Sequence, residues 1–346
     1  MKIAILGAGL CGRLLAIRLL DLGVSICLIE KDFSGQHSCA YQAAGMVAPI
    51  SELVCGEPLL AKLGAFGLQM WSYYSEKLEH AIDFVQSSTI WLSQADEKEV
   101  LMHYLATLKS HTNLQWVNKS YLQEILLCHL KCAGGIKIDN EAYLNPRQFF
   151  KYSSAYLKEA CDLIVLETSQ NETYLEHFDW VIDTRGLGAF ESLKTLRGVK
   201  GELLRLKIQS HLKQMIRFFT RHGIYYLKPE GEQQYLLGGT EIETNEGGLI
   251  TVENYLYLLA TLSNFLPEFR QAELIGCQVG LRPTLSSGLP QLKIVNNIIS
   301  LNGFYRHGFL ISPFFIEWAI YLMDLRSVDP SLILTLEDRK RLCNAI

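Results

Sequence analysis

The chain has 346 residues, of which 49% are hydrophobic and 20% charged, which is typical of a packed globular protein of about two domains and excludes disorder. The formal net charge of -4 and the lack of a Lys/Arg run interleaved with aromatics argue against a nucleic-acid partner. No stretch reaches the roughly 18 uncharged apolar residues of a membrane-spanning helix, and the nine scattered cysteines indicate a reduced, cytoplasmic protein.

The first thirty residues predict one βαβ unit. A β-rich apolar run covers residues 2–6, a helical pattern covers 14–20, and a second buried strand covers 24–29. The glycine-rich turn after the first run therefore lies between a strand and a helix.

That turn has the G-x-G-x-x-G spacing of a dinucleotide-binding site. Gly7 permits the tight turn, Gly9 lets the backbone approach a pyrophosphate, and Gly12 brings helix and strand together. Glu30 ends the second strand, where a carboxylate accepts hydrogen bonds from ribose hydroxyls. The alternative is a glycine-rich turn with a surface glutamate, and the fingerprint alone fits NAD as well as FAD.

Helices follow in the middle of the chain. We expect them over residues 57–77 and 97–108, and Asn145-Pro146 has the N-cap and first-position residues of a helix that ends near Ala160. Residues 179–183 form a buried strand that returns to the first sheet. Cys128 and Cys132 flank His129, but no second ligand pair follows at zinc-site spacing, so no metal is expected.

From residue 201 to 240 the pattern changes to alternating strands separated by polar turns, which predicts an antiparallel sheet. A helix from Val252 to Phe265 follows, and strands resume at Gly276. The predicted fold class is α/β (α+β), a Rossmann-like dinucleotide-binding domain interleaved with a domain built on the antiparallel sheet.

Further segments carry a family resemblance. They are residues 42–49 (QAAGMVAP), 182–189 (IDTRGLGA), 196–202 (LRGVKGE), 280–284 (GLRPT) with 287–290 (SGLP), and 301–313 (LNGFYRHGFLISP). On these segments the chain resembles the D-amino acid oxidase superfamily of FAD-dependent oxidoreductases, and within it the bacterial glycine oxidases of thiamine biosynthesis. The matched segments extend over nearly the whole chain.

The resemblance implies FAD as the cofactor and assigns the residues that hold it. They are Gly7, Ala8, Gly9, Cys11, Gly12, Glu30, Lys31, Ala43, Ala44, Gly45, Met46, Thr184, Gly186, Gly303, Tyr305, Arg306, His307, Gly308, Phe309 and Leu310. It also implies a division into discontinuous domains. The FAD-binding domain is expected to comprise residues 1–80, 140–195 and 276–346, and the substrate-binding domain 81–139 and 196–275.

Three side chains are the candidate catalytic residues. Arg282 aligns with the family arginine that binds the substrate carboxylate, a task suited to a guanidinium fork. Tyr226 aligns with the tyrosine that touches the same carboxylate; strand neighbours face opposite ways, so Tyr225 is excluded if Tyr226 is right, although a one-residue difference in loop length leaves the register open. Arg306 aligns with the arginine beside the flavin and the amine end of the site.

The activity implied by the resemblance is oxidative deamination of glycine or a similar small amino acid by dioxygen, with peroxide release and an expected link to thiamine thiazole synthesis. The partners are then a small amino-acid substrate and dioxygen, and self-association stays open. Sarcosine, a D-amino acid or proline as substrate is the nearest alternative.

Two alternatives of other classes remain. A nicotinamide-dependent dehydrogenase would use Glu30 equally well, but the segment 301–313 argues against it. A flavin-binding protein without turnover also remains, because Asp183, Ser287 and Lys293 depart from the family pattern.

Overall fold

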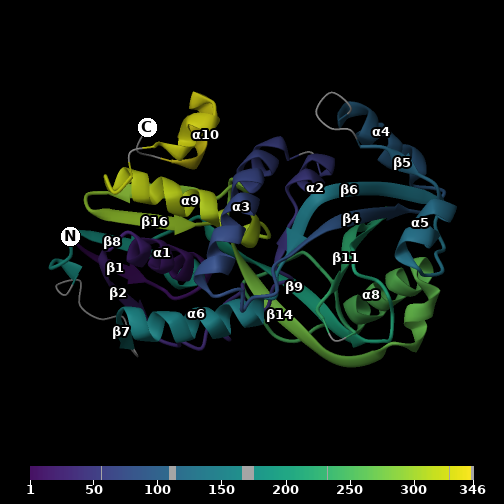
Figure 1. Cartoon of the computed structure of the whole chain (residues 1–346), viewed down its shortest axis with the longest axis horizontal. Coiled ribbons are helices and arrows are strands. Elements are labelled where there is room, and N and C mark those ends of the chain that lie inside the picture. The colour runs from purple at the N-terminus through teal and green to yellow at the C-terminus, as the bar shows by residue number, and fades with distance from the viewer. Residues whose placement is uncertain (56, 109–113, 166–174, 232, 327, 344–346) are drawn as a thin grey trace.

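The computed structural model describes residues 1–55, 57–108, 114–165, 175–231, 233–326 and 328–343. Its strands form two sheets that lie at opposite ends of the long axis, and the long strands β9 and β14 of the second sheet extend to the middle of the molecule (Figure 1). The mixed fold class predicted from the sequence is confirmed.

The first sheet has six strands in the order β15-β16-β8-β1-β2-β7. Their bounds are β1 Lys2–Leu6, β2 Ser25–Glu30, β7 Asp162–Val165, β8 Trp180–Asp183, β15 Gln291–Val295 and β16 Ile298–Asn302. All neighbours are parallel except β15 and β16, which form a hairpin. The βαβ unit and the returning strand at 179–183 are therefore confirmed, with β8 beside β1.

Four helices pack with this sheet in one large apolar core. They are α1 Leu10–Asp21, α3 Pro58–Lys77, α6 Pro146–Ala160 and α9 Gly308–Leu322. Asn145 caps α6 as predicted, since its side-chain oxygen accepts from the amides of Arg147 and Gln148. Trp71 of α3 donates from its ring nitrogen to the carbonyl oxygen of Phe309 at 2.6 Å, which fixes α3 against the start of α9. A short helix, α10 Leu336–Leu342, ends the described chain.

The second sheet has ten strands. Eight follow the order β13-β9-β12-β11-β10-β4-β6-β3, while β14 pairs with β9 and β5 with β6. Their bounds are β3 Met46–Val47, β4 Val85–Ser93, β5 Trp116–Val117, β6 Gly134–Tyr143, β9 Leu196–Lys207, β10 Met215–Thr220, β11 Gly223–Pro229, β12 Gln234–Gly238, β13 Ile242–Glu243 and β14 Glu273–Leu285.

The expectation of an antiparallel sheet over 201–240 holds for β9, β11 and β12 but is wrong at one edge. Strand β10, which the alternation did not predict, pairs antiparallel with β11 and parallel with β4. Its second partner comes from more than a hundred residues earlier, so no local pattern specifies that pairing. The sheet is therefore mixed.

Several helices accompany the second sheet. They are α2 Pro49–Val54, α4 Lys98–Leu108, α5 Lys119–Leu126 and α8 Val252–Phe265, with 3₁₀ turns at Gly186–Ala189, Pro267–Gln271 and Pro330–Ile333 in the chain as a whole. Helix α8 packs its apolar face on the central strands. Within the described ranges, no helix is long and apolar enough to cross a membrane.

Each sheet draws strands from distant parts of the sequence, which is the interleaving that the sequence predicts. Strand β14 pairs with β9 along its length, in the second sheet, although residues 276–285 fall in the expected FAD-binding range. The residue boundaries of the two domains stay a proposal.

Candidate active site

One long cavity, of about 2590 Å³, is lined by residues of both sheets. Most of the residues predicted to bind a cofactor or substrate line it: Gly7, Ala8, Gly9, Cys11, Glu30, Lys31, Ala43, Ala44, Gly45, Met46, Thr184, Gly186, Tyr226, Arg282, Tyr305, Arg306, His307, Gly308, Phe309 and Leu310. Gly12 and Gly303 are not among the residues that line it. Segments far apart in the sequence therefore meet at one site.

The glycine turn after β1 forms one end of the cavity. Gly7 has a φ of +93°, and a Cβ on Gly12 would lie 1.9 Å from the carbonyl oxygen of Gly7, so only glycine permits this approach of helix to turn. A Cβ on Gly9 would meet only Ser38 within the described chain, at 3.6 Å. The backbone at Gly9 is thus open to the cavity.

The first amides of α1 face this opening. Gly9 is the N-cap, and no described side chain caps the helix, so its amide donors and positive dipole end are available to a phosphate. Glu30 lies alongside, and its carboxylate accepts from the amides of Ala8 at 2.7 Å and Lys31 at 2.8 Å. This end of the cavity fits the pyrophosphate and ribose of a dinucleotide.

The turn after β8 closes over the same end. The hydroxyl oxygen of Thr184 lies 2.9 Å from the carbonyl oxygens of both Leu6 and Gly7. Asp183, which departs from the family pattern, binds the guanidinium of Arg185 at 3.0 and 2.7 Å. Arg185 also lines the cavity and was not predicted. The acidic residue two positions earlier, Asp183, is the sequence feature that could have indicated it.

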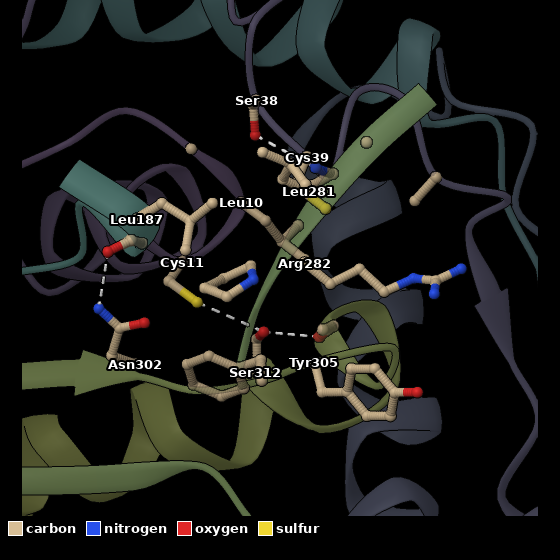
Figure 2. Close-up of a pocket in the computed structure, with 18 of the residues that line it drawn as sticks. Leu10, Cys11, Ser38, Cys39, Leu187, Leu281, Arg282, Asn302, Tyr305 and Ser312 are labelled. Carbon is tan, nitrogen blue, oxygen red and sulfur yellow. Dashed lines mark hydrogen bonds between the residues drawn. The ribbon is translucent and has the colours of Figure 1, made fainter. Parts of the chain in front are cut away.

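The segment before α9 forms part of the wall towards the other end. The amide of Tyr305 donates to the carbonyl oxygen of Pro283 at 2.9 Å, which ties this segment to β14. Gly303 has a φ of +82°, and its missing Cβ leaves room for Leu285. In Figure 2 the side chains of Arg282 and Tyr305 extend in the same direction, away from Cys11 and Ser312.

Arg282 and Tyr226 come together at this second end. The Tyr226 hydroxyl and a terminal nitrogen of Arg282 lie 3.2 and 3.3 Å from one point, the position that a Cβ on Gly239 would occupy. Arg282 also lies across Gly201 and donates to the carbonyl oxygen of Thr240 at 2.9 Å. Burial raises the pKa of Tyr226 to about 12, so its hydroxyl is a donor at neutral pH.

Tyr225 points the other way along β11. Its ring packs against Tyr257 of α8 with centroids 5.3 Å apart, and its hydroxyl donates to the carbonyl oxygen of His222. Part of Tyr225 also lines the cavity. The neighbour that stands beside Arg282 is Tyr226, and its role at the site stays a prediction.

Arg306 is held by carboxylates. It lies 3.3 Å from Glu52 and 3.6 Å from Glu57, and 3.7 Å from Glu241. Burial lowers the pKa of Arg306, but these acids, Glu52 foremost, hold it above its usual range. Arg306 is therefore a fixed cation in the cavity wall.

Glu52 is the centre of this cluster and was not predicted. Its carboxylate lies 3.2 Å from the His307 ring nitrogen and 3.5 Å from Arg217 of β10. Burial raises the pKa of Glu52, but the His307 hydrogen bond and the charges of Arg306 and Arg217 outweigh it and hold the pKa well below the usual range. Glu52 is thus ionised, and the His307 ring lies within hydrogen-bond distance of its carboxylate.

Two cysteines line the cavity without the character of nucleophiles. Burial raises the pKa of Cys11 and of Cys39 to about 11, so both are thiols at neutral pH. Cys11 donates to the hydroxyl of Ser312 at 3.4 Å (Figure 2). Among the described residues, no group of three His, Cys, Asp or Glu could hold a metal ion.

Comparisons with known proteins agree with this geometry. The family model described as "FAD dependent oxidoreductase" matches residues 2–322. The chain is 28% identical over 321 residues to a putative thiamine biosynthesis oxidoreductase ThiO of Rhizobium etli, covering 90% of this chain and 93% of that protein. It is 22% identical to a glycine oxidase of Pseudomonas aeruginosa, covering 95% and 97%.

A solved structure shares the fold. The glycine oxidase of Geobacillus kaustophilus superposes with a TM-score of 0.80 at 20% identity, covering 94% of this chain and 96% of that one.

Proposed function

Since the chain belongs to the family of FAD dependent oxidoreductases, we propose that it is an oxidase that deaminates glycine or a similarly small amino acid with dioxygen. The single observation that carries this proposal is the meeting of Arg282 and Tyr226 over the same point at the end of the cavity away from the glycine turn. A guanidinium beside a phenol donor is suited to a substrate carboxylate.

FAD is the cofactor, and when bound it would supply the two-electron acceptor for oxidation of the amine. The glycine turn, the α1 amides and Glu30 would hold its dinucleotide half. The segments 42–46 and 303–310 would lie along its ring. The absence of a Cβ at Gly9 and the uncapped α1 support this fit.

Orientation of the substrate is the task of Arg282 and Tyr226. Two contacts to one carboxylate fix its plane, so the α-carbon is presented in one direction. Arg282 is itself fixed by the carbonyl oxygen of Thr240 and by the glycine backbone beneath it. A pre-positioned fork of this kind lowers the entropy lost on binding.

The Glu52 cluster gives the site a fixed charge pattern. Glu52 stays ionised because it lies between Arg306 and Arg217 and accepts from His307. We assign no general base, because hydride loss from a neutral amine needs no proton abstraction at the α-carbon, and the proton leaves the nitrogen of the resulting iminium afterwards.

The amine gives up two electrons and two protons and becomes an imine, and dioxygen takes them to become hydrogen peroxide. Water then hydrolyses the imine to an oxo acid and ammonia. For glycine the oxo acid is glyoxylate.

A role in thiamine thiazole synthesis is part of the proposal and is supported by the name of the Rhizobium etli relative. The proposal includes a cytoplasmic location, supported by the nine scattered cysteines of the sequence.

The test is a substrate panel on the purified FAD-loaded protein. Glycine, sarcosine, D-alanine and L-proline are compared by oxygen consumption, peroxide and oxo-acid product. We expect the highest kcat/KM for glycine or sarcosine. A preference for L-proline or D-alanine would show that the proposed substrate is wrong. No turnover with any amine would favour a flavin-binding protein without activity.

A further inference from the structure

A second arginine stands beside the proposed carboxylate site. Arg217 of β10 pairs in register with Tyr226 of β11, and paired residues of neighbouring antiparallel strands project from the same face of the sheet. Arg217 is 4% exposed and lines the cavity. Tyr226 is therefore a neighbour of Arg217 across the strand pair, while its hydroxyl and Arg282 approach the same point beside Gly239.

Arg217 has unused hydrogen-bonding capacity. One terminal nitrogen lies 3.5 Å from Glu52, and the guanidinium lies 5.3 Å from the ring centre of Trp91. Its Nε has no hydrogen-bond partner in the described part of the chain. A buried guanidinium donor left unpaired is costly, so an acceptor is expected when the site is filled.

The acids near Arg217 are already engaged by other groups. Glu52 is shared with Arg306 and His307. Glu141 accepts from the amide and hydroxyl of Ser51 at 2.6 and 2.9 Å, and burial raises its pKa. Neither acid supplies a partner for the Nε of Arg217.

We propose that Arg217 forms a second anion-binding subsite, so that the preferred substrates are small amines that carry two carboxylates, one bound by Arg282 with Tyr226 and the other by Arg217. This inference rests on the proposed amine oxidation. It extends the proposed substrates from glycine-sized amino acids to amino dicarboxylates such as N-carboxymethyl amino acids, which should be better substrates than the monocarboxylate amines of the panel.

Binding of inert ligands tests the subsite without turnover. Oxydiacetate and methoxyacetate are ether analogues of iminodiacetate and sarcosine that differ by one carboxylate. The FAD-loaded protein is titrated with each by calorimetry and by the visible flavin spectrum. We expect oxydiacetate to bind at least about tenfold more tightly, the effect of one charged hydrogen bond.

Variants assign the preference to Arg217. Arg217→Met should remove the preference for oxydiacetate by weakening oxydiacetate binding more than methoxyacetate binding, and Arg217→Lys should keep part of the preference because it keeps the charge. Arg221→Gln is the matched control, since Arg221 follows the same strand but its side chain is 67% exposed and paired with Asp96. It should bind both ligands like the wild type.

Equal binding of the two ligands by the wild type would overturn the subsite, and that comparison needs no variant to fold. Persistence of the preference in Arg217→Met would overturn the assignment to Arg217. The same variant should lower kcat/KM for iminodiacetate relative to sarcosine by about tenfold or more. If no amine is oxidised, the proposed function fails while the ligand pair still decides whether the subsite exists.

Discussion

A single methyl group at Gly201 should displace the proposed carboxylate-binding arginine. A Cβ at this position would lie 2.2 Å from a terminal nitrogen of Arg282 and 2.4 Å from its guanidinium carbon. Non-bonded heavy atoms need about 3.5 Å, so the guanidinium must move by more than about 1 Å. A displacement of that size costs about a hundredfold in rate, or about 2.8 kcal/mol of transition-state stabilisation.

The fold should tolerate the change. Gly201 lies outside the left-handed region, so alanine fits its backbone, and the atoms that must move are the end of a flexible side chain. We expect Gly201→Ala to lower kcat/KM for the best amine of the panel by about a hundredfold. Its free energy of unfolding should change by less than about 1 kcal/mol, and its FAD content should be unchanged.

The assay is steady-state oxygen consumption, with thermal unfolding and the flavin-to-protein absorbance ratio recorded on the same samples. Gly276→Ala is the matched control, because a Cβ on this glycine of β14 would meet nothing within 4 Å in the described ranges. It should behave like the wild type. If Gly201→Ala kept the kcat/KM of the wild type, activity would not depend on the position of Arg282 against the Gly201 backbone.

Further variants probe the rest of the cavity. Arg282→Ala should lose about 2–5 kcal/mol of substrate stabilisation in kcat/KM and still bind FAD; near-native turnover would remove Arg282 from the site. Tyr226→Phe should lower kcat/KM about tenfold through the lost hydrogen bond to a charged group, whereas Tyr225→Phe should change it little, and the reverse order would place the other tyrosine in the site. Gly12→Ala should lower stability by about 1–3 kcal/mol and release FAD on gel filtration, because its Cβ would lie 1.9 Å from a backbone oxygen of the glycine turn. The pKa of Glu52 lies below its usual range in the folded protein, so its stabilising effect is present above about pH 4.3 and is lost as pH falls. Glu52→Gln should therefore lose less thermal stability on acidification than the wild type. Equal decreases of the unfolding temperature in the two proteins at low pH would contradict this.

The parts of the site that follow from local sequence could be predicted well. The strand, glycine turn and helix depend on neighbours within a few residues, and the structure has them where the pattern indicates. The alternation of β11 also predicts that only one of Tyr225 and Tyr226 stands beside Arg282, and it is Tyr226. The chemical roles of these residues stay predictions.

The remaining parts depend on contacts between distant segments. Glu52 lies in a short helix whose sequence matches no motif. Its place in the site could not be predicted, because it depends on contacts with Arg217 and His307, which are distant in the sequence. Strand β10 was missed because its parallel partner β4 lies far away in the chain. Asp183 looked like a weakness of the family match, yet it binds Arg185 at the cavity edge.

Amine oxidation by this flavoprotein can be seen in the visible absorption spectrum of the purified protein, recorded before and after anaerobic addition of glycine or another amine of the panel. We expect the bands of oxidised flavin in the starting protein, their bleaching by the preferred amine, and their return when dioxygen is admitted. A protein that shows flavin bands which no amine bleaches would contradict amine oxidation.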